Sequence, residues 1–283
     1  MKVVTLFVRH GTNKYPQAES KLEHIFSTQL ADLSWSLLVI DNALPASFQP
    51  EQSGFRTVIA GDNTAWEFSG WNKGLEALGD EIWSYDLVHL ATSAFHTLYT
   101  EYLDRFDSRM LAAVSNRPVC VGHIDAYNEP VQLFSYRSQH WLRTSFIFLP
   151  VLDARLLGSL VSLSTGDGIF SSSPSRPFLP DAPLSSNYRR FIIDWLTGED
   201  IGQGTVWHSK LSLAAEDFPL FKAKALAILN EHLLGLRLRA QGTSLVDATW
   251  LASQLAVRHP AAIQWTTSWR DQLANRDSDA IAL

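Results

Sequence analysis

The chain has 283 residues, of which 46% are hydrophobic, so it can bury a full core in one large domain or one and a half ordinary ones. Its formal net charge is −6 and no block of Lys and Arg occurs, which argues against a nucleic-acid-binding surface. The single cysteine, Cys120, excludes an internal disulfide framework and a cysteine-based zinc site. The first residues turn polar too soon for a signal peptide, and no run of about 18 apolar residues occurs, so we expect a cytoplasmic chain without a transmembrane helix.

Strands and helices are expected to alternate over the first half of the chain. Apolar runs predict strands at 3–8, 37–40, 57–60, 87–90, 119–123 and 143–149. Apolar periodicity predicts helices between them, over 22–30, from the third strand up to Leu78, and over 97–114. Mostly apolar strands in this alternation are typical of a parallel or mixed sheet covered on both faces.

The second half of the chain changes in composition near Ser164. From there to Asn187 it is rich in Ser, Pro, Gly and Asp, which predicts a long loop. Helices are predicted over 188–196, 218–238 and 245–255, and glycines break the chain between 198 and 204. We therefore predict an α/β core over 1–165, a loop-rich insertion or lid over 166–217, and a helical portion over 218–283.

Polar residues follow several predicted strands at the point where each strand ends. Each pair alone could be a helix cap. In a βα alternation, however, all of them emerge at the carboxyl edge of the sheet, where a crevice is the default ligand site. The pairs are Arg9-His10, Asp41-Asn42, Asp62-Asn63 and Thr92-Ser93.

One segment late in the chain resembles a motif of a known enzyme family. Glu231 is followed at fixed spacing by Leu234, Arg237 and Gly242. This resembles the acidic-pair segment of GT-A glycosyltransferases of the family 2 type. By that resemblance Glu231 corresponds to the second acid, which acts as general base, and Asn230 replaces the first acid.

Three earlier segments resemble the same family in the right order. The strand that ends at Asp41-Asn42 looks like the second strand, whose terminal Asp contacts the nucleotide base. Asn63 and the stretch Trp71-Asn72-Lys73-Gly74 resemble the helix that lines the nucleotide. Residues 87–93 match the strand that normally ends in the Asp-x-Asp metal motif. The resemblance covers about 1–165 and 218–250, and it implies a GT-A-like (Rossmann-like) mostly parallel sheet sandwiched by helices.

The chain departs from the family where the metal carboxylates should stand. It has Ala91-Thr92-Ser93, and hydroxyl groups hold Mg²⁺ or Mn²⁺ poorly. We therefore expect no divalent metal and no other cofactor. Stabilising a leaving diphosphate would then fall to cationic or dipolar groups such as Arg9, Arg143, His208 and helix N-termini.

The resemblance implies transfer of a sugar from a nucleotide-sugar donor to a glycan or lipid-linked glycan acceptor, in bacterial surface polysaccharide synthesis. It implies an inverting displacement with Glu231 as the base. It also leaves room for association with other enzymes or with the inner face of the membrane. The donor-binding residues that we predict are Arg9, Asp41, Asp62, Asn63, Asn72, Thr92, Ser93 and Arg143. The acceptor-binding residues that we predict are His123, Asp125, Trp207 and His208.

Three alternatives stay open. Arg9-His10-Gly11 looks like the opening of histidine phosphatases, in which His10 would accept the phosphoryl group and His123 would correspond to the second histidine. No segment of the chain supplies the second phosphate-binding arginine of that family, and Arg56 is the nearest substitute. Glu199-Asp200 is a rival acidic pair for the base. The lost metal carboxylates also permit an inactive sugar- or nucleotide-binding module.

Overall fold

The computed structural model of the protein describes residues 1–97, 100–198 and 210–280, and the chain divides into two compact units. Unit 1 comprises Met1–Ile124, Leu142–Leu160 and Arg237–Leu283. Unit 2 comprises Asp125–Trp141 and Val161–Leu236. The two units thus interleave along the chain, whereas the sequence predicted three consecutive segments.

Within the described residues, eight strands form one open, mostly parallel sheet in the order β3-β4-β2-β1-β5-β7-β6-β8. The strands are β1 Lys2–Arg9, β2 Ser34–Asp41, β3 Glu51–Ser53, β4 Arg56–Ala60, β5 Leu87–Thr92, β6 Val119–Leu133, β7 Tyr136–Pro150 and β8 Ser244–Asp247. β1 is parallel to β2 and β5, β2 to β4, and β6 to β8. β3 and β7 run antiparallel to β4 and β5. The predicted α/β class with a parallel or mixed sheet is confirmed.

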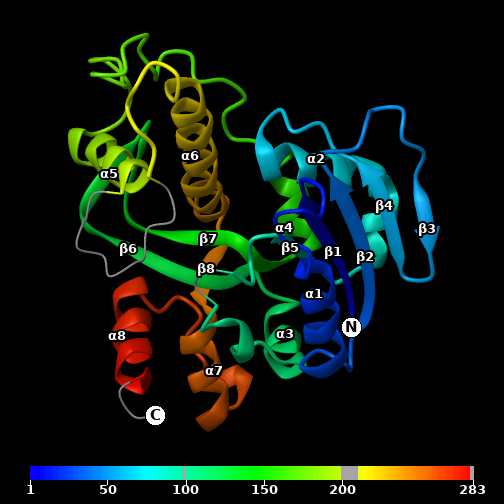
Figure 1. The fold of residues 1–283 in the computed structure, drawn as a ribbon. Coiled ribbons are helices and arrows are strands. Elements are labelled where there is room, and N and C mark those ends of the chain that lie inside the picture. Colours follow the sequence, from blue (N-terminus) through cyan, green and yellow to red (C-terminus); the bar gives the residue numbers. More distant parts are fainter. Residues whose placement is uncertain (98–99, 199–209, 281–283) are drawn as a thin grey trace. The chain divides into compact units, whose positions relative to one another are not determined.

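Helices cover both faces of the sheet in unit 1 (Figure 1). The helices of this unit are α1 Ala18–Thr28, α2 Trp66–Leu78, α3 Ser108–Val114, α4 Val151–Leu156, α7 Ala248–Val257 and α8 Trp269–Ala280, with the 3₁₀ helices η1 Gly79–Ser84, η2 Leu103–Arg105 and η3 Pro260–Ala262. α1, α3 and α7 share a buried cluster with Val3 and Phe7 of β1. α2 packs on the other face, where Gly70 and Gly74 approach Val8 and Leu6.

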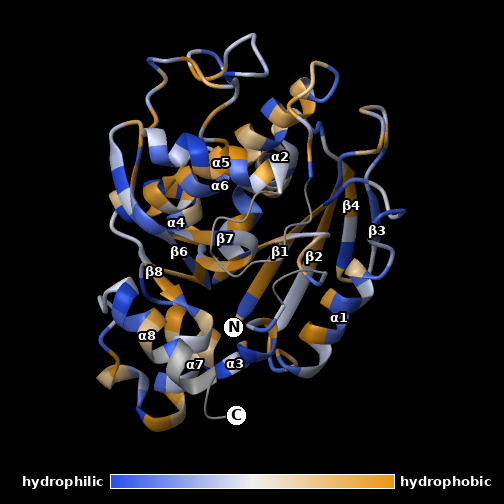
Figure 2. Ribbon diagram, turned by 60° about the vertical axis from the view of Figure 1, so that its left-hand side comes forward, coloured by the Kyte–Doolittle hydropathy of each residue, from blue (hydrophilic) through white to orange (hydrophobic). Residues whose placement is uncertain are grey.

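The hydropathy pattern explains these layers. β1 is mostly hydrophobic and is buried from Val3 to Val8, because alternate side chains enter the two covered faces (Figure 2). α1 alternates between hydrophobic and polar residues, as expected for a helix with one buried stripe (Figure 2). The core of unit 1 therefore lies on both sides of β1, β2 and β5, and it holds their ends in fixed register.

Unit 2 is built on the outer parts of the β6–β7 hairpin together with α5 Ser186–Thr197 and most of α6 Phe218–Ala240. Its core is aromatic, with Tyr127, Trp141, Tyr188 and Phe191 among its buried residues. The Ser/Pro-rich segment expected as a loop has little regular structure, but hydrogen bonds from α5 anchor part of it. There Arg189 donates hydrogen bonds to four backbone carbonyls, those of Leu179, Pro180, Ala182 and Leu184.

The structure corrects two of the predicted helices. Among the described residues of the helix expected over 97–114, only η2 and α3 are helical, because Asp107 caps α3 by accepting a hydrogen bond from the Met110 N–H at 2.6 Å. The helix expected over 245–255 is split into β8 and α7. Leu245 and Val246 pair with Cys120 and Val121 of β6, so tertiary pairing outweighs the local apolar periodicity.

The other long elements agree with the sequence. The helices expected over 188–196 and 218–238 are confirmed as α5 and α6, while α4 and α8 were missed. Among the helices formed by the described residues, none has the length and hydropathy needed to cross a bilayer.

Candidate functional site

The carboxyl ends of the parallel strands in unit 1 form one edge of the sheet, which we call the rim. Polar residues occupy the rim after β4, β2, β1 and β5 in spatial order, and they are Asp62-Asn63, Asp41-Asn42, Arg9-His10 and Thr92-Ser93. The register aligns these ends, since Arg9 lies opposite Asp41 and Val8 opposite Thr92. β1 lies between β2 and β5, so the connections leave it in opposite directions along the sheet. Such a switch point is where open α/β sheets bind ligands.

Some polar side chains at the rim make hydrogen bonds and ion pairs that stabilise the fold itself. The Asp41 carboxylate accepts hydrogen bonds from the Gly11 N–H at 2.8 Å, the Ala43 N–H at 3.0 Å and Arg9 Nε at 2.7 Å. Burial alone would raise the pKa of Asp41, but these hydrogen bonds and the charge of Arg9 lower it below its ordinary value. Asp41 therefore shapes the loop after β1 as a buried carboxylate.

Arg9 is shared between two carboxylates. Its Nη1 lies 2.7 Å from Glu19 on α1, and Glu19 is also paired with Arg56 at the start of β4. Asp41, Arg9, Glu19 and Arg56 thus form a chain of alternating charges that joins β2, β1, α1 and β4. Two of the five N–H donors of Arg9 serve these two pairs, so the guanidinium is mainly a structural cation with donors left over.

The loop between β4 and α2 presents two of the predicted donor residues to solvent. Asp62 and Asn63 are exposed, and Asn63 has a left-handed backbone with φ of 54°. Asn42 holds the loop, because its Nδ2 donates to Asn63 Oδ1 at 3.2 Å and to the Trp66 carbonyl at 3.1 Å. Gly61 is required here, since a Cβ at that position would lie 1.8 Å from Asn42 Oδ1.

Two residues of α2 singled out by the resemblance point into the protein. Asn72 donates to Ser159 Oγ at 2.8 Å and accepts from the Leu160 N–H at 2.7 Å, so its amide joins α2 to the segment after α4. Trp71 is fully buried and its indole N–H donates to the Leu6 carbonyl at 3.0 Å. Trp71 therefore supports the sheet beneath the rim, and Asn72 fixes α2 to the segment after α4.

The end of β5 is the next part of the rim. Thr92 and Ser93 are half-buried, and the Ser93 N–H continues the pairing with β1 by donating to the Val8 carbonyl at 2.9 Å. Arg143 is buried on the neighbouring strand β7, three residues before Phe146, which pairs with Ala91 of β5.

Sequence reasoning missed one group at the switch point. His96 follows the end of β5, and its ring lies against Tyr15 from the loop after β1, with centroids 6.2 Å apart at 76°. The signal in the sequence was its place four residues after Thr92.

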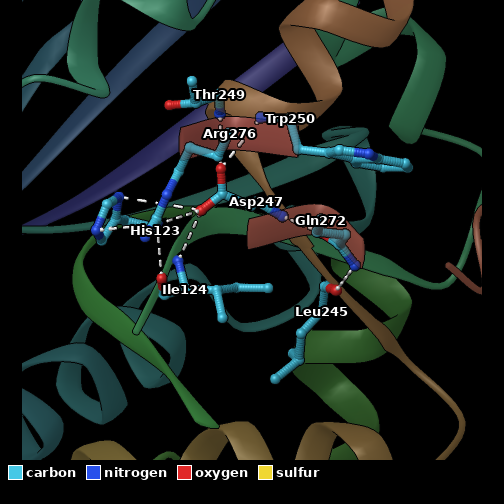
Figure 3. A network of polar contacts seen from close by, with 8 residues as sticks. All are labelled: His123, Ile124, Leu245, Asp247, Thr249, Trp250, Gln272 and Arg276. Carbon is cyan, nitrogen blue, oxygen red and sulfur yellow. Dashed lines mark hydrogen bonds and ion pairs between the residues drawn. The ribbon is translucent and has the colours of Figure 1, made fainter. Parts of the chain in front are cut away.

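The far end of the rim carries a network centred on Asp247, which is fully buried (Figure 3). Its Oδ1 accepts from the N–H groups of Thr249 and Trp250 at 3.0 and 3.1 Å, which caps α7. Its Oδ2 accepts from the Ile124 N–H at 3.0 Å and pairs with Arg276 of α8 at 3.1 Å. One carboxylate thus joins β6, β8, α7 and α8.

His123, a predicted acceptor-binding residue, belongs to this network. Its Nδ1 lies 4.0 Å from Asp247 Oδ2, and its Nε2 lies 3.4 Å from Arg276 Nη1 (Figure 3). Tyr102 covers the ring, with centroids 5.0 Å apart. The ring of His123 is thus held among Tyr102, Asp247 and Arg276, all of which belong to the structural network at this end of the rim.

In unit 2, Glu231 and Asp125 act on the same buried aromatic cluster. The hydroxyls of Tyr127 and Tyr188 lie 2.8 and 2.7 Å from His232 Nδ1. Burial raises the pKa of both phenols, and the charge of Glu231 raises both further. Burial lowers the pKa of His232 to about 3, although the charge of Asp125 opposes this. Glu231 is half-buried beside this neutral cluster.

The residue that replaces the family's first acid has a structural role. Asn230 is buried, and its Oδ1 accepts from the N–H groups of Ser162 and Leu163 at 2.7 and 2.9 Å. Its Nδ2 donates to the Leu163 carbonyl at 3.0 Å. A carboxylate could accept the first two bonds but could not make the third, which accounts for an amide at this position. Trp207, His208 and the rival pair Glu199-Asp200 lie outside the described residues.

The described residues contain no group of three or more His, Cys, Asp or Glu side chains arranged to hold a metal ion. The chemistry available at the rim is that of two amide or carboxylate side chains after β4, two hydroxyls after β5, and cationic groups from both sides of the switch point. Comparison of the chain with protein-family models and with curated proteins found no match.

Proposed function

We propose that the protein is a glycosyltransferase that moves a sugar from a nucleotide-sugar donor to a glycan or lipid-linked glycan acceptor without a divalent metal. In this proposal residues of the rim bind the donor, and Glu231 is the general base, as the resemblance implies. The sequence resemblance to GT-A enzymes of the family 2 type gives the reaction class. The α/β sheet with its switch point between β1 and β5 is compatible with that class.

One observation supports the donor site more than any other. The predicted donor-binding residues Asp62, Asn63, Thr92 and Ser93 reach one rim from strands β4 and β5, which lie on either side of β2 and β1. Burial would raise the pKa of Asp62, but hydrogen bonds from Thr64 and Ser69 and the charge of Lys73 lower it, so this carboxylate is ionised at neutral pH. An ionised carboxylate beside an amide suits hydrogen-bond donors such as ribose hydroxyls and base N–H groups.

The proposed reaction is a single inverting displacement. An acceptor hydroxyl oxygen forms a bond to the anomeric carbon of the donor sugar as the bond from that carbon to the diphosphate oxygen breaks. Glu231 takes the proton of the hydroxyl, and the electron pair of the broken bond leaves on the nucleoside diphosphate. Because Thr92 and Ser93 carry no charge, neutralising that diphosphate falls to protein cations in this proposal.

The phosphatase reading has less support. A phosphoenzyme chemistry based on His10 would need two free arginines and a second histidine at the same phosphate. Arg9 and Arg56 are both paired with Glu19. His123 is on β6, three strands from β1, which corresponds to roughly 14 Å at the usual strand spacing. An inactive binding module remains the outcome to be excluded by assay.

The first experiment is a donor-hydrolysis assay with a panel of nucleotide sugars, with and without EDTA. We expect slow release of nucleoside diphosphate from one donor, unchanged by EDTA. Absence of turnover and of binding for the whole panel would reject the proposal. A strict requirement for Mn²⁺ or Mg²⁺ would reject its metal-free form.

The second experiment is Glu231→Gln, with Glu216→Gln as the matched control on an exposed side chain of the same unit. Removing a general base is expected to lower turnover by about 10²- to 10⁴-fold while nucleotide binding is retained. The control variant should keep the full rate. Near-normal transfer by Glu231→Gln would move the base to another residue, and loss of folding, checked by circular dichroism, would make the residue structural.

A further inference from the structure

The loops after β1 and β5 meet through an aromatic contact at the switch point. Tyr15 packs edge-on against His96, and Tyr15 itself rests on the core of unit 1. The His96 ring is half-buried and its Nδ1 has no hydrogen-bond partner among the described residues. The contact thus places an imidazole just after the end of β5, against the loop that follows β1, with a buried Nδ1 that lacks a hydrogen-bond partner among the described residues.

Cations surround this contact. Lys14 Nζ lies 5.1 Å from the centre of the Tyr15 ring, and Lys21 on the first turns of α1 is close enough for its charge to act on His96. The carboxylates on the same helix act elsewhere, since Glu19 pairs with Arg9 and Arg56, and the charge of Glu23 acts on Arg56. We call Lys14, Lys21 and His96 around Tyr15 the cationic rim. It is a positive patch on a chain whose net charge is −6.

We propose that the cationic rim binds the diphosphate of the nucleotide-sugar donor, and that protonated His96 donates a hydrogen bond to an oxygen of the leaving diphosphate. This inference rests on the proposed function and names groups that could replace the metal. As the bond to the anomeric carbon breaks, negative charge grows on the leaving oxygen, and a cationic donor aimed at it lowers the barrier. The proton stays on the imidazole, so His96 transfers no group.

The surroundings of His96 predict that diphosphate binding is coupled to the uptake of a proton. Burial and the charge of Lys21 lower the pKa of His96, while the Ser93 carbonyl favours the protonated ring. Tyr15 and Phe95 contribute only aromatic contacts. In the free protein the ring is therefore mostly neutral at pH 7. A bound diphosphate favours the protonated ring, so binding takes up a proton.

The test is isothermal titration calorimetry of the full chain with three probes, namely nucleoside diphosphates, the matching nucleosides and inorganic pyrophosphate. Titrations at pH 6.5 in two buffers of different ionisation enthalpy report proton uptake. We expect His96→Gln to weaken nucleoside diphosphate binding roughly tenfold, to reduce the proton uptake, and to leave nucleoside binding unchanged. His259→Gln, an exposed histidine that follows the C-terminal end of α7, is the matched control and should change nothing.

The outcomes separate the two proposals. Unchanged diphosphate affinity and proton uptake in His96→Gln would overturn the cationic rim while the glycosyltransferase proposal stands. Pyrophosphate binding that depends on His96, with no preference for any nucleotide, would support diphosphate binding by the cationic rim and would count against the glycosyltransferase proposal. Equal loss of nucleoside and diphosphate binding in His96→Gln would show a purely structural role and would overturn the inference.

Discussion

The switch point and the far end of the rim in unit 1 each carry a histidine, and the two histidines have different surroundings. At the β6–β8 end, His123 lies between Tyr102, Asp247 and Arg276, and a fully buried carboxylate organises the group. At the switch point between β1 and β5, His96 lies against Tyr15 and within reach of the charge of Lys21, and its buried Nδ1 has no hydrogen-bond partner among the described residues.

The difference gives a criterion for separating polar residues that stabilise the fold from polar residues that are available to a ligand, when both lie on one edge of a sheet. Where the fold satisfies each donor and acceptor, a polar residue is explained by the elements that it joins. Where hydrogen-bonding capacity is left over beside a switch point, we propose that a ligand uses it. By this criterion Asp247 and Asp41 belong to the first class, and the proposal assigns Asp62, Asn63 and His96 to the second.

The largest effect expected from this comparison is at the β6–β8 end. Asp247→Asn leaves Arg276 without its buried counter-charge and turns an acceptor into a donor that faces other donors. Breaking a buried pair by removing one partner costs about 3 kcal/mol or more. Hydrogen exchange should show strongly reduced protection at Ile124 and at the start of α7, together with loosening of α8.

Asp32→Asn is the control for this prediction, since Asp32 is exposed between α1 and β2. It should leave exchange at all three segments unchanged. If Asp247→Asn exchanged like the wild type, the Asp247 network would not be the structural centre of that end, and the contrast between the two histidines would lose its basis.

A smaller effect is expected at Asp41, with a definite pH dependence. Asp41→Asn loses the charge that pairs with Arg9 and is expected to cost about 2 kcal/mol at pH 7. The pKa of Asp41 is lowered in the fold, so its contribution is fully present above the ordinary Asp pKa of about 3.9 and is lost as the pH falls below that value.

Urea unfolding of wild type and Asp41→Asn at a series of pH values between about 3 and 7 tests that sign. The difference in unfolding free energy between the two proteins should be largest near neutral pH and should narrow below about pH 4. A difference in unfolding free energy that does not change with pH would mean that the charge of Asp41 contributes nothing to stability, and that only the exchange of a carboxyl group for an amide does.

The sequence was sufficient to predict the rim. Apolar runs gave the parallel strands, and the polar residue after each run gave its carboxyl end, because both signals are local. The structure then shows that Asp41 and Asn72 are bound by the fold, through Arg9 and through Ser159. Those partners lie 32 and 87 residues away. No spacing rule within one segment reveals such a partner.

The same limit applies to unit 2. The sequence singled out Glu231 and Asp125 separately, more than 100 residues apart, and the structure brings both to the cluster around Tyr127 and His232. What the sequence missed was the cluster itself. Tyr188 lies next to a segment interpreted as a loop, and its packing against His232 depends on how α5 and α6 come together. Burial of a tyrosine is a tertiary property, so composition alone could not predict it.

The smallest effect on stability is expected for His96→Gln, and it decides whether the comparison holds. His96 makes aromatic contacts with Tyr15 and Phe95 and anchors no buried charge, so the variant should change the unfolding free energy by no more than about 0.5 kcal/mol. The measurement is the urea midpoint at pH 7, read beside Asp247→Asn in the same buffer. A loss comparable with that of Asp247→Asn would make both histidines structural. A near-zero loss, together with weaker diphosphate binding, would mean that residues with capacity left over by the fold are the ones that contact the ligand.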